Sequence, residues 1–168
     1  GNTFDRCEGA LTLRHGNDCV VLGNIIIGGG KKGTGGIRVV GERHRIVGNH
    51  VEGTDGRVDG AIALSAGVAD AELHEHVEAK DCLIEGNTLV GNRGAEMSFG
   101  HGLGEHGRTV LPQNLEIRFN HFYGLKKEDF DPGFELSSFG KWEANNDFEA
   151  MGLRIDLADG EDFHPIEV

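Results

Sequence analysis

The sequence predicts an all-β chain wound as a right-handed parallel β-helix of about five to six coils. Three observations predict this solenoid: an Asn that recurs before an apolar residue, a short alternating strand that recurs after that Asn, and the balance of glycine and proline. The chain has 28 Gly but only 3 Pro in 168 residues. Abundant glycine with little proline is typical of short strands joined by tight turns.

The recurring Asn marks one position in each predicted coil. The intervals between successive Asn are 22, 25, 38, 33 and 26 residues. Asn tolerates a left-handed backbone at a corner, and its amide can hydrogen-bond to the Asn of the neighbouring coil. We therefore expect six side chains to line up along one edge: Asn2, Asn24, Asn49, Asn87, Asn120 and Asn146.

A short strand follows each of the first four Asn, in the segments GALTLRHG, GGIRVVG, GAIALSAG and GAEMSFG. Alternation along a strand sends one set of side chains inward and the other outward. The inward set begins with Leu11/Leu13, Ile37/Val39 and Ile62/Leu64. We expect the opposite set to face solvent: Thr12, Arg14, Arg38, Ala63 and Ser65. In the fourth segment the frame slips by one residue, which predicts Met97 and Phe99 inward and Glu96 and Ser98 outward.

The two longest intervals predict corner insertions at residues 66–80 and 100–113. Repeat proteins commonly place binding functions on loops that extend from one corner. Cys19, His44 and Cys82 each precede a ladder Asn by five residues, so they should share a column on successive coils. Cys19 and Cys82 would then lie about two coil rises apart, too far for a disulfide. A Cys-His-Cys metal site would still need a fourth ligand, and we expect none.

We divide the chain into β-helix coils at residues 1–124 and a last coil with an acidic capping segment at 125–168. The second part has four Lys/Arg against twelve Asp/Glu. A solenoid needs caps because an open coil exposes core and strand edges. Nothing precedes the first ladder Asn that could cap it, so we expect the N-terminal face to lack its cap.

The charge is unevenly distributed along the chain. The net charge is -12, but residues 1–57 sum to +2 and the remainder to -14. Steering of a charged ligand follows the local field, so the first third is where an anionic ligand could dock. No stretch of 18 or more apolar residues occurs, which predicts no membrane span. We also predict no nucleic-acid partner.

Histidines gather in the predicted insertions. His74-Glu75-His76 has metal-like composition, although alternate residues of a polar loop usually face solvent. His101 and His106 flank a glycine-rich loop and could line the rim of a cleft. The Lys31-Lys32 pair lies in another corner loop, where solvated lysines are common.

Several segments resemble polysaccharide lyase family 6, the chondroitinase B-like and alginate lyases. The resemblance rests on Asn2-Thr3-Phe4, Gly9 through Asn17, Lys32 through Arg38, and His44 with Asn49. It is specific from residue 1 to about 65 and looser over about 120 residues. The family fold is a right-handed parallel β-helix, in agreement with the repeat. The stretch KGTGGIR is more similar to the alginate lyases than to chondroitinase B.

The resemblance implies β-elimination at a uronic acid, with a Lys as base, an Arg as acid and calcium bound nearby. Arg14 and His15 match the Arg-His-Gly motif and are the catalytic candidates that the resemblance implies. Arg57 resembles a family position that contacts sugar acid groups. Arg38 and Lys32 are the further substrate-binding candidates.

The sequence departs from the family pattern before Arg14. No Lys and no paired acids occur there, so the resemblance implies calcium whose ligands are not in this chain, and we predict no metal-binding residue. We expect a uronate lyase that acts on alginate rather than on dermatan or chondroitin and that is inactive without upstream coils or a second subunit. The resemblance also implies secretion or a periplasmic location. The alternative is a non-catalytic polysaccharide-binding or adhesion β-helix. A pectin-type hydrolase ranks last because the strand faces show Arg, Thr and Ser rather than clustered Asp.

Overall fold

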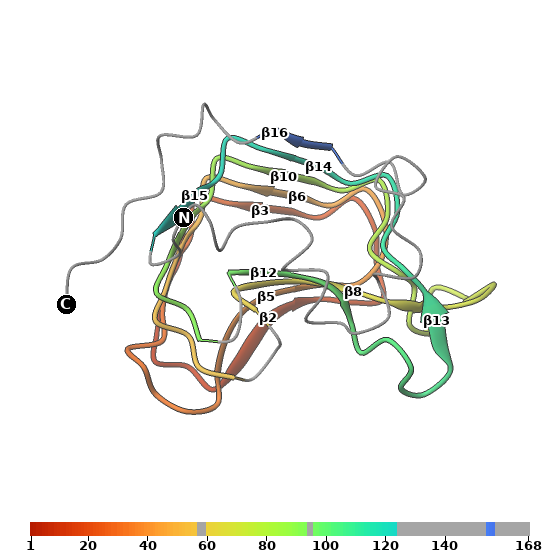
Figure 1. Ribbon diagram of the computed structural model, residues 1–168, viewed down its shortest axis with the longest axis horizontal. Helices are drawn as coiled ribbons and strands as arrows, with labels where there is room; N and C mark the ends of the chain where they lie inside the picture. The colour runs from red at the N-terminus through yellow and green to blue at the C-terminus, as the bar shows by residue number, and fades with distance from the viewer. Residues whose placement is uncertain (57–59, 94–95, 124–153, 157–168) are drawn as a thin grey trace.

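The computed structural model describes residues 1–56, 60–93, 96–123 and 154–156. Every regular element in these ranges is a strand, and the strands stack coil upon coil into three parallel sheets (Figure 1). This arrangement confirms the predicted β-helix. The described residues contain no helix with the length and apolar character needed to cross a membrane.

Each of the first four coils gives one strand to each sheet, and the described part of the fifth gives one to the first and one to the third. The first sheet consists of β1 (Thr3–Asp5), β4 (Ile25–Ile27), β7 (His50–Glu52), β11 (Thr88–Val90) and β15 (His121–Tyr123). The second sheet consists of β2 (Gly9–Leu13), β5 (Thr34–Val39), β8 (Ile62–Ser65) and β12 (Met97–His101). The third sheet consists of β3 (Val20–Leu22), β6 (Arg45–Val47), β10 (Leu83–Glu85), β14 (Glu116–Arg118) and β16 (Arg154–Asp156).

Alternate residues of a strand face opposite sides, so the middle side chain is buried in the three-residue strands β3, β4, β6, β7, β10, β11 and β14. In the third sheet, strand pairing stacks Val21, Ile46, Ile84 and Ile117 in one column. All four are almost fully buried in the common core. Each coil therefore repeats the same inward aliphatic position, and the core is continuous along the stack.

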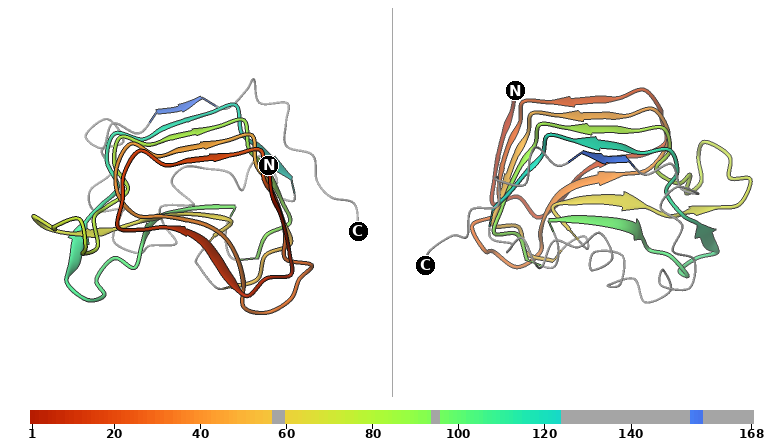
Figure 2. Two further views of the ribbon diagram at one scale, coloured as in Figure 1. Left: turned by 180° about the vertical axis from the view of Figure 1, so that it is seen from behind. Right: turned by 45° about the horizontal axis from the view of Figure 1, so that its top comes forward.

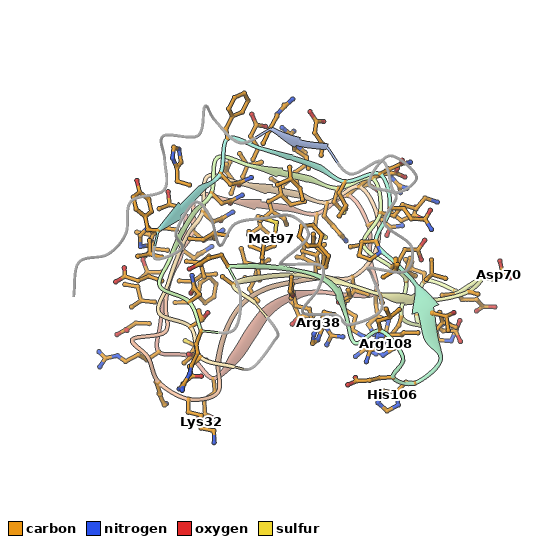
Figure 3. All side chains as sticks on the ribbon, in the orientation of Figure 1. Lys32, Arg38, Asp70, Met97, His106 and Arg108 are labelled. Carbon is orange, nitrogen blue, oxygen red and sulfur yellow. The ribbon has the colours of Figure 1, made fainter. Side chains whose placement is uncertain are left out.

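The second sheet has longer strands and contributes two inward columns. Pairing aligns Leu11, Ile37, Ile62 and Met97 in one column and Leu13, Val39, Leu64 and Phe99 in the other. Met97 points into the interior (Figure 3) and belongs with Phe99 to the core cluster. The predicted one-residue slip of the fourth segment is therefore confirmed for its inward residues.

The asparagine ladder is confirmed for five of the six predicted residues. The side-chain Nδ2 of each Asn donates to the Oδ1 of the next: Asn2 to Asn24 at 3.1 Å, Asn24 to Asn49 at 2.9 Å, Asn49 to Asn87 at 2.9 Å and Asn87 to Asn120 at 2.8 Å. The same Oδ1 atoms also accept backbone N–H groups, for example that of Asn49 on Asn87 at 3.0 Å. Asn146 lies outside the described residues.

The left-handed backbone at this corner belongs to the residue before the Asn, which corrects our expectation. Gly23, Gly48 and Gly86 have φ of 63°, 61° and 61°, and Phe119 has φ of 55°. Glycine adopts this conformation without a steric penalty. The chain turns at glycine, and the Asn that follows keeps an ordinary backbone and points its amide along the stack.

Cys19, His44 and Cys82 occupy one column, as predicted. Arg45 N donates to Cys19 O at 2.9 Å and Leu83 N donates to His44 O at 2.9 Å, so the three residues lie on successive coils. His44 Nδ1 accepts the backbone N–H of Cys19 at 3.2 Å, which leaves Nε2 to donate to Val40 O at 3.1 Å. Burial lowers the pKa of His44, which agrees with this neutral tautomer. All three cysteines are free thiols.

The outward side chains of the later coils are buried, contrary to our expectation that this set faces solvent. Thr12 and Arg14 are exposed, but Ala63 and Ser65 are 0 % exposed. The side chain of Arg38 reaches over the neighbouring coil and its Nε donates to Ser65 Oγ at 3.3 Å. Longer side chains thus cover small ones on the same face.

Glu96 and Ser98 are likewise buried, at 2 % and 1 % exposure. Glu96 accepts two hydrogen bonds from Asn92, one from Nδ2 at 2.6 Å and one from the backbone N at 3.1 Å. Asn92 Oδ1 in turn accepts from Thr54 N and Oγ1 at 3.0 and 2.8 Å. These bonds form a second ladder at another corner, which the sequence analysis did not identify.

The first coil forms one end of the stack, with β1, β2 and β3 each at an edge of its sheet (Figure 2). Of its inward side chains, Phe4, Leu11 and Leu13 are only partly buried, whereas Val21 is buried. The proposed boundary at 124/125 and the capping segment fall almost entirely outside the described residues. Of that segment the structure describes only β16, which pairs in parallel with β14.

Replacing Asn49 by Ala tests the ladder. Asn49 is 1 % exposed, and its Nδ2 donates to Val21 O and Asn87 Oδ1, both at 2.9 Å. Asn49→Ala leaves these buried partners unsatisfied and should lower the free energy of unfolding by about 1–3 kcal/mol. Asn114 has a left-handed backbone with φ of 48°, so Asn114→Gly, which keeps that conformation and removes an exposed bond to Asp81 at 3.0 Å, is the control. Equal effects of the two variants in urea unfolding would contradict the ladder's role.

Glu96 should make stability depend on pH. Burial raises the pKa of Glu96 from 4.5 to about 7, against the effect of the Asn92 hydrogen bonds. Between these values the folded chain binds more protons than the unfolded chain, so stability should fall as pH rises, by up to about 3 kcal/mol in total. Glu96→Gln should remove this slope, whereas the exposed Glu8→Gln should retain it. Parallel pH profiles of unfolding for Glu96→Gln and wild type would refute the assignment.

Candidate functional site

The outward face of the second sheet brings two of the predicted cations onto neighbouring coils. The pairing of β2 with β5 sets Thr12 beside Arg38, and Arg14 follows directly after β2. Val40 N donates to Leu13 O at 3.1 Å, so the coil contact continues to the end of the strand. Arg14 is exposed and Arg38 is half-buried. The two side chains therefore come from adjacent coils at the same end of the sheet.

The two predicted insertions extend from that same end of the sheet (Figure 1). β9 (Gly67–Val68) lies in the first insertion and β13 (Arg108–Val110) in the second, and they pair antiparallel within an otherwise parallel fold. Val68 N donates to His76 O at 2.8 Å, and Arg108 is the register partner of Val68. The β9–β13 pair therefore holds His76 and Arg108 close to the strand ends.

Arg108 is a buried cation on the second insertion. Its side chain is only 5 % exposed. Its Nη2 donates to Glu105 Oε2 at 2.8 Å, and its Nε donates to Glu105 O at 3.3 Å. Its Nη1 is buried and has no hydrogen-bond partner within the described part of the chain. A guanidinium has five N–H donors, so this group has capacity for an acceptor.

The backbone of Gly102 provides the surface on which this guanidinium lies. Gly102 has φ of 79°, and a Cβ built on it would lie 2.0 Å from Arg108 Nη1. A side chain at residue 102 would therefore displace the guanidinium. Glycine is required here both by the backbone conformation and by the close approach of Arg108.

The electrostatic surroundings of His76 indicate that these basic side chains lie near one another. Burial lowers the pKa of His76, and the positive charges of Arg108, Arg14, Arg38 and His106 lower it further, in that order. Three arginines and a histidine, from three segments of the chain, thus act on one imidazole. Figure 3 shows Arg38, Arg108 and His106 on the outer side of the second sheet. We call Arg14, Arg38, His76, His106 and Arg108 the basic cluster.

The basic cluster is suited to an anion. His76 Nδ1, like Arg108 Nη1, is buried without a hydrogen-bond partner among the described residues. Like charges held together repel, and a bound carboxylate or sulfate would relieve that repulsion while accepting hydrogen bonds. Arginine suits such groups because its planar fork matches their oxygens.

The other predicted site residues lie apart or outside. His15 follows Arg14 with φ of 59° and is exposed. Lys32 is exposed at the opposite end of the second sheet from Arg108 (Figure 3). Arg57 falls in 57–59, outside the described residues. The structure thus brings Arg14 and Arg38 together and does not bring Lys32 to them.

Two features of the site were not predicted from the sequence: the role of Arg108 and the electrostatic surroundings of His76. His74 is exposed and lies 3.4 Å from Glu72, while His76 turns to the basic cluster, so the two histidines have different surroundings. His106, expected at a cleft rim, belongs to the cluster, and His101 is the register partner of Ser65. The one available signal for Arg108 was its place beside His101 and His106 in the insertion.

Within ranges 1–56, 60–93 and 96–123, no three His, Cys, Asp or Glu side chains gather as metal ligands would. Calcium takes six to eight oxygen ligands, mostly carboxylates and carbonyls. We therefore assign no step of the chemistry below to a metal held by these residues.

The comparisons with known proteins point to one family. The family model described as chondroitinase B matches residues 1–128. The chain is similar in structure to the family 6 alginate lyase AlyGC, with 25 % identity over 99 % of this chain and 22 % of that chain, at a TM-score of 0.71. It is similar to a family 6 alginate lyase in complex with a trisaccharide, with 25 % identity over 73 % of this chain and 30 % of that one, at a TM-score of 0.60.

A family 6 polysaccharide lyase from Pseudopedobacter saltans shares the fold, with 24 % identity over 99 % of this chain and 42 % of that one, at a TM-score of 0.65. A comparison with curated proteins found no match. The chain thus spans well under half the length of each of these solved lyases. The chain belongs to the chondroitinase B-like lyases of polysaccharide lyase family 6.

Proposed function

We propose that the chain is the part of a uronate-specific polysaccharide lyase that binds the acidic sugar and carries its proton donor, with alginate as the preferred polymer. The observation that carries the proposal is the basic cluster, where Arg14 and Arg38 converge with the insertion cations on one imidazole. Family membership supports lyase chemistry. The similarity of KGTGGIR to the alginate lyases supports the choice of polymer.

β-Elimination needs a cationic environment at the sugar. The proton at C5 is poorly acidic while the neighbouring carboxylate carries its charge, so cations that pair with the carboxylate stabilise the developing enolate. A base removes the C5 proton, the C4–O bond breaks as the C4=C5 double bond forms, and the leaving glycosidic oxygen is protonated. Arg14, exposed at the end of β2, is the proposed donor to that oxygen, with His15 beside it. Arg38 is proposed to pair with the carboxylate.

The base is assigned to none of the described lysines. Lys31 lies 3.6 Å from Glu8, Lys80 lies 3.9 Å from Glu42, and Lys32 lies at the far end of the sheet. We propose that the base and the calcium ligands implied by the family come from further coils or from a second subunit. Secretion or a periplasmic location, as the resemblance implies, is part of the same proposal.

Removing Arg14 tests the assignment. The assay uses the complete natural polypeptide that contains these residues, with alginate, dermatan or chondroitin and with or without calcium, and follows the ultraviolet absorbance of the unsaturated product. Arg14→Ala should lower kcat by at least about 100-fold, because it removes a donor at the breaking bond, while thermal unfolding is unchanged. Arg45→Ala, an exposed strand arginine of the third sheet, is the control. Near-normal turnover of Arg14→Ala would exclude Arg14 from the mechanism.

The alternative function is a non-catalytic polysaccharide-binding or adhesion β-helix, which the same basic cluster would serve. It predicts that the complete polypeptide binds alginate but forms no unsaturated product under any of these conditions. Product formation by the wild type would exclude this alternative.

His76 provides a test that does not require turnover. Since neighbouring cations and burial lower the pKa of His76, a bound uronate anion should raise it by neutralising those cations. A titration of the His76 ring by NMR, with and without an oligouronate, should show this upward change. The ring of exposed His74, two residues away, should change little. A pKa of His76 that is the same with saturating ligand would place the anion elsewhere.

A further inference from the structure

We propose that Arg108, lying on Gly102 and beside His76, forms a separate recognition position for a second acidic group of the polymer, on the uronate next to the one held by Arg14 and Arg38. This inference rests on the proposed function and adds a residue that determines specificity. Arg108 comes from a corner insertion, whereas Arg14 and Arg38 come from the coil strands. The insertion could therefore differ in length or sequence without disturbing the coils.

The loop before β13 fixes the position of Arg108 in advance of binding. Within it, Glu105 N donates to Gly102 O at 3.1 Å, Arg108 N donates to Glu105 O at 2.9 Å, and Gly104 N donates to Arg108 O at 2.8 Å. The Glu105 carboxylate and carbonyl then hold the Nη2 and Nε atoms of the side chain. A guanidinium held in this way loses little conformational entropy when it binds an anion.

The unused donors of Arg108 indicate where the anion would lie. Nη1 is buried with no hydrogen-bond partner among residues 1–56, 60–93 and 96–123, and an unpaired buried donor is unfavourable. An acceptor at Nη1 removes that cost, and His76 Nδ1 is a second buried ring atom without a partner in the same described ranges. Two buried polar atoms in one basic cluster thus have no partner among the described residues and can pair with a group that reaches them.

The charge of Arg108 persists despite its ion pair. Glu105 is mostly exposed, with 66 % of its side chain in solvent, whereas Arg108 is 5 % exposed. Water screens the exposed carboxylate more effectively than the buried guanidinium. In agreement, Arg108 is the largest electrostatic influence that lowers the pKa of His76, and Glu105 is not among the influences on it. The field that an approaching substrate meets at this position is therefore positive.

The chemical class of ligand follows from these donors. A group with oxygen acceptors and negative charge fits: the carboxylate of a uronate, or a sulfate ester on a neighbouring sugar. We propose that the group is a carboxylate, because the basic cluster would then bind two successive uronates of an uninterrupted polyuronate. A sulfated polymer with alternating neutral sugars is the competing source of the same anion chemistry.

The test measures binding by calorimetry with a mannuronate tetramer, a sulfated dermatan tetramer and a carboxyl-reduced, neutral tetramer. Arg108→Gln in the complete natural polypeptide should lower the affinity for the mannuronate tetramer by roughly tenfold. It should leave the weak binding of the neutral tetramer unchanged. Turnover should show a raised KM with kcat within about twofold, because a uniform binding contact is lost. Arg93→Gln, an exposed arginine paired with Asp55 at 3.2 Å, should bind like the wild type.

Two further variants keep the test decisive if Arg108→Gln fails to fold. Gly102→Ala should displace Arg108 Nη1, and His76→Ala should remove the imidazole beside Arg108. Each variant should lower the affinity for the mannuronate tetramer but not the affinity for the neutral tetramer. Wild-type affinity in every folded variant among these three would show that Nη1 holds water only, and would overturn the inference.

The outcomes separate this inference from the proposed function. Loss of turnover in Arg14→Ala with unchanged binding in the Arg108 variants would leave the proposed function standing and remove the second position. If Arg108→Gln lowered the affinity for the dermatan tetramer more than that for the mannuronate tetramer, the choice of carboxylate would be overturned. Unchanged binding and turnover in both the Arg14 and the Arg108 variants would overturn both proposals.

Discussion

The backbone hydrogen bonds between successive coils are the constraint on which the rest of the structure depends. Because each coil must pair with the one before it along three sheets, the chain returns to the same place after every circuit. Residues at equivalent positions therefore stack, whether they are aliphatic, as in the Val21–Ile117 column, or polar, as in the asparagine ladder. Extra residues can leave this arrangement only at a corner, which is where both insertions occur.

The functional site follows from that constraint. Coil pairing sets Arg14 and Arg38 on adjacent coils, and the insertions of the next two coils reach back to the same end of the sheet with His76 and Arg108. Gathering like charges is unfavourable, and the structure offsets it in part by pairing Arg108 with Glu105 and by keeping His76 neutral through burial. The remaining positive charge is the basis of the proposed selectivity for an acidic polymer.

The fold was predictable because a solenoid repeats its physical requirements in the sequence. The spacing of Asn24, Asn49 and Asn87, and the alternation that sends Ile37 and Ile62 inward, predict the ladder and the core. The corner conformation was assigned to the wrong residue, because both Asn and the preceding Gly tolerate positive φ and only coordinates distinguish them. The burial of Ala63 and Ser65 depends on a neighbouring coil's Arg38, and no single-strand pattern contains that information.

The site was predictable only where it belongs to the repeat. Arg38 lies in β5 and Arg14 directly after β2, in segments whose register the sequence indicates, and their shared face follows from alternation. Arg108 lies in an insertion with no repeat to set its position, and its relation to His76 arises from the antiparallel pairing of β9 with β13. Lys32 was a substrate-binding candidate because of the family resemblance, but it lies at the opposite end of the second sheet from Arg108 (Figure 3).

The most direct test of the central claim, that coil stacking and the insertions assemble one anion site, is a crystal structure of the complete natural polypeptide with a bound uronate oligosaccharide. The account predicts one sugar carboxylate within hydrogen-bond distance of Arg14 or Arg38 and the next within hydrogen-bond distance of Arg108 Nη1. An oligosaccharide bound on another face, or across the second sheet without contact to the insertions, would contradict it.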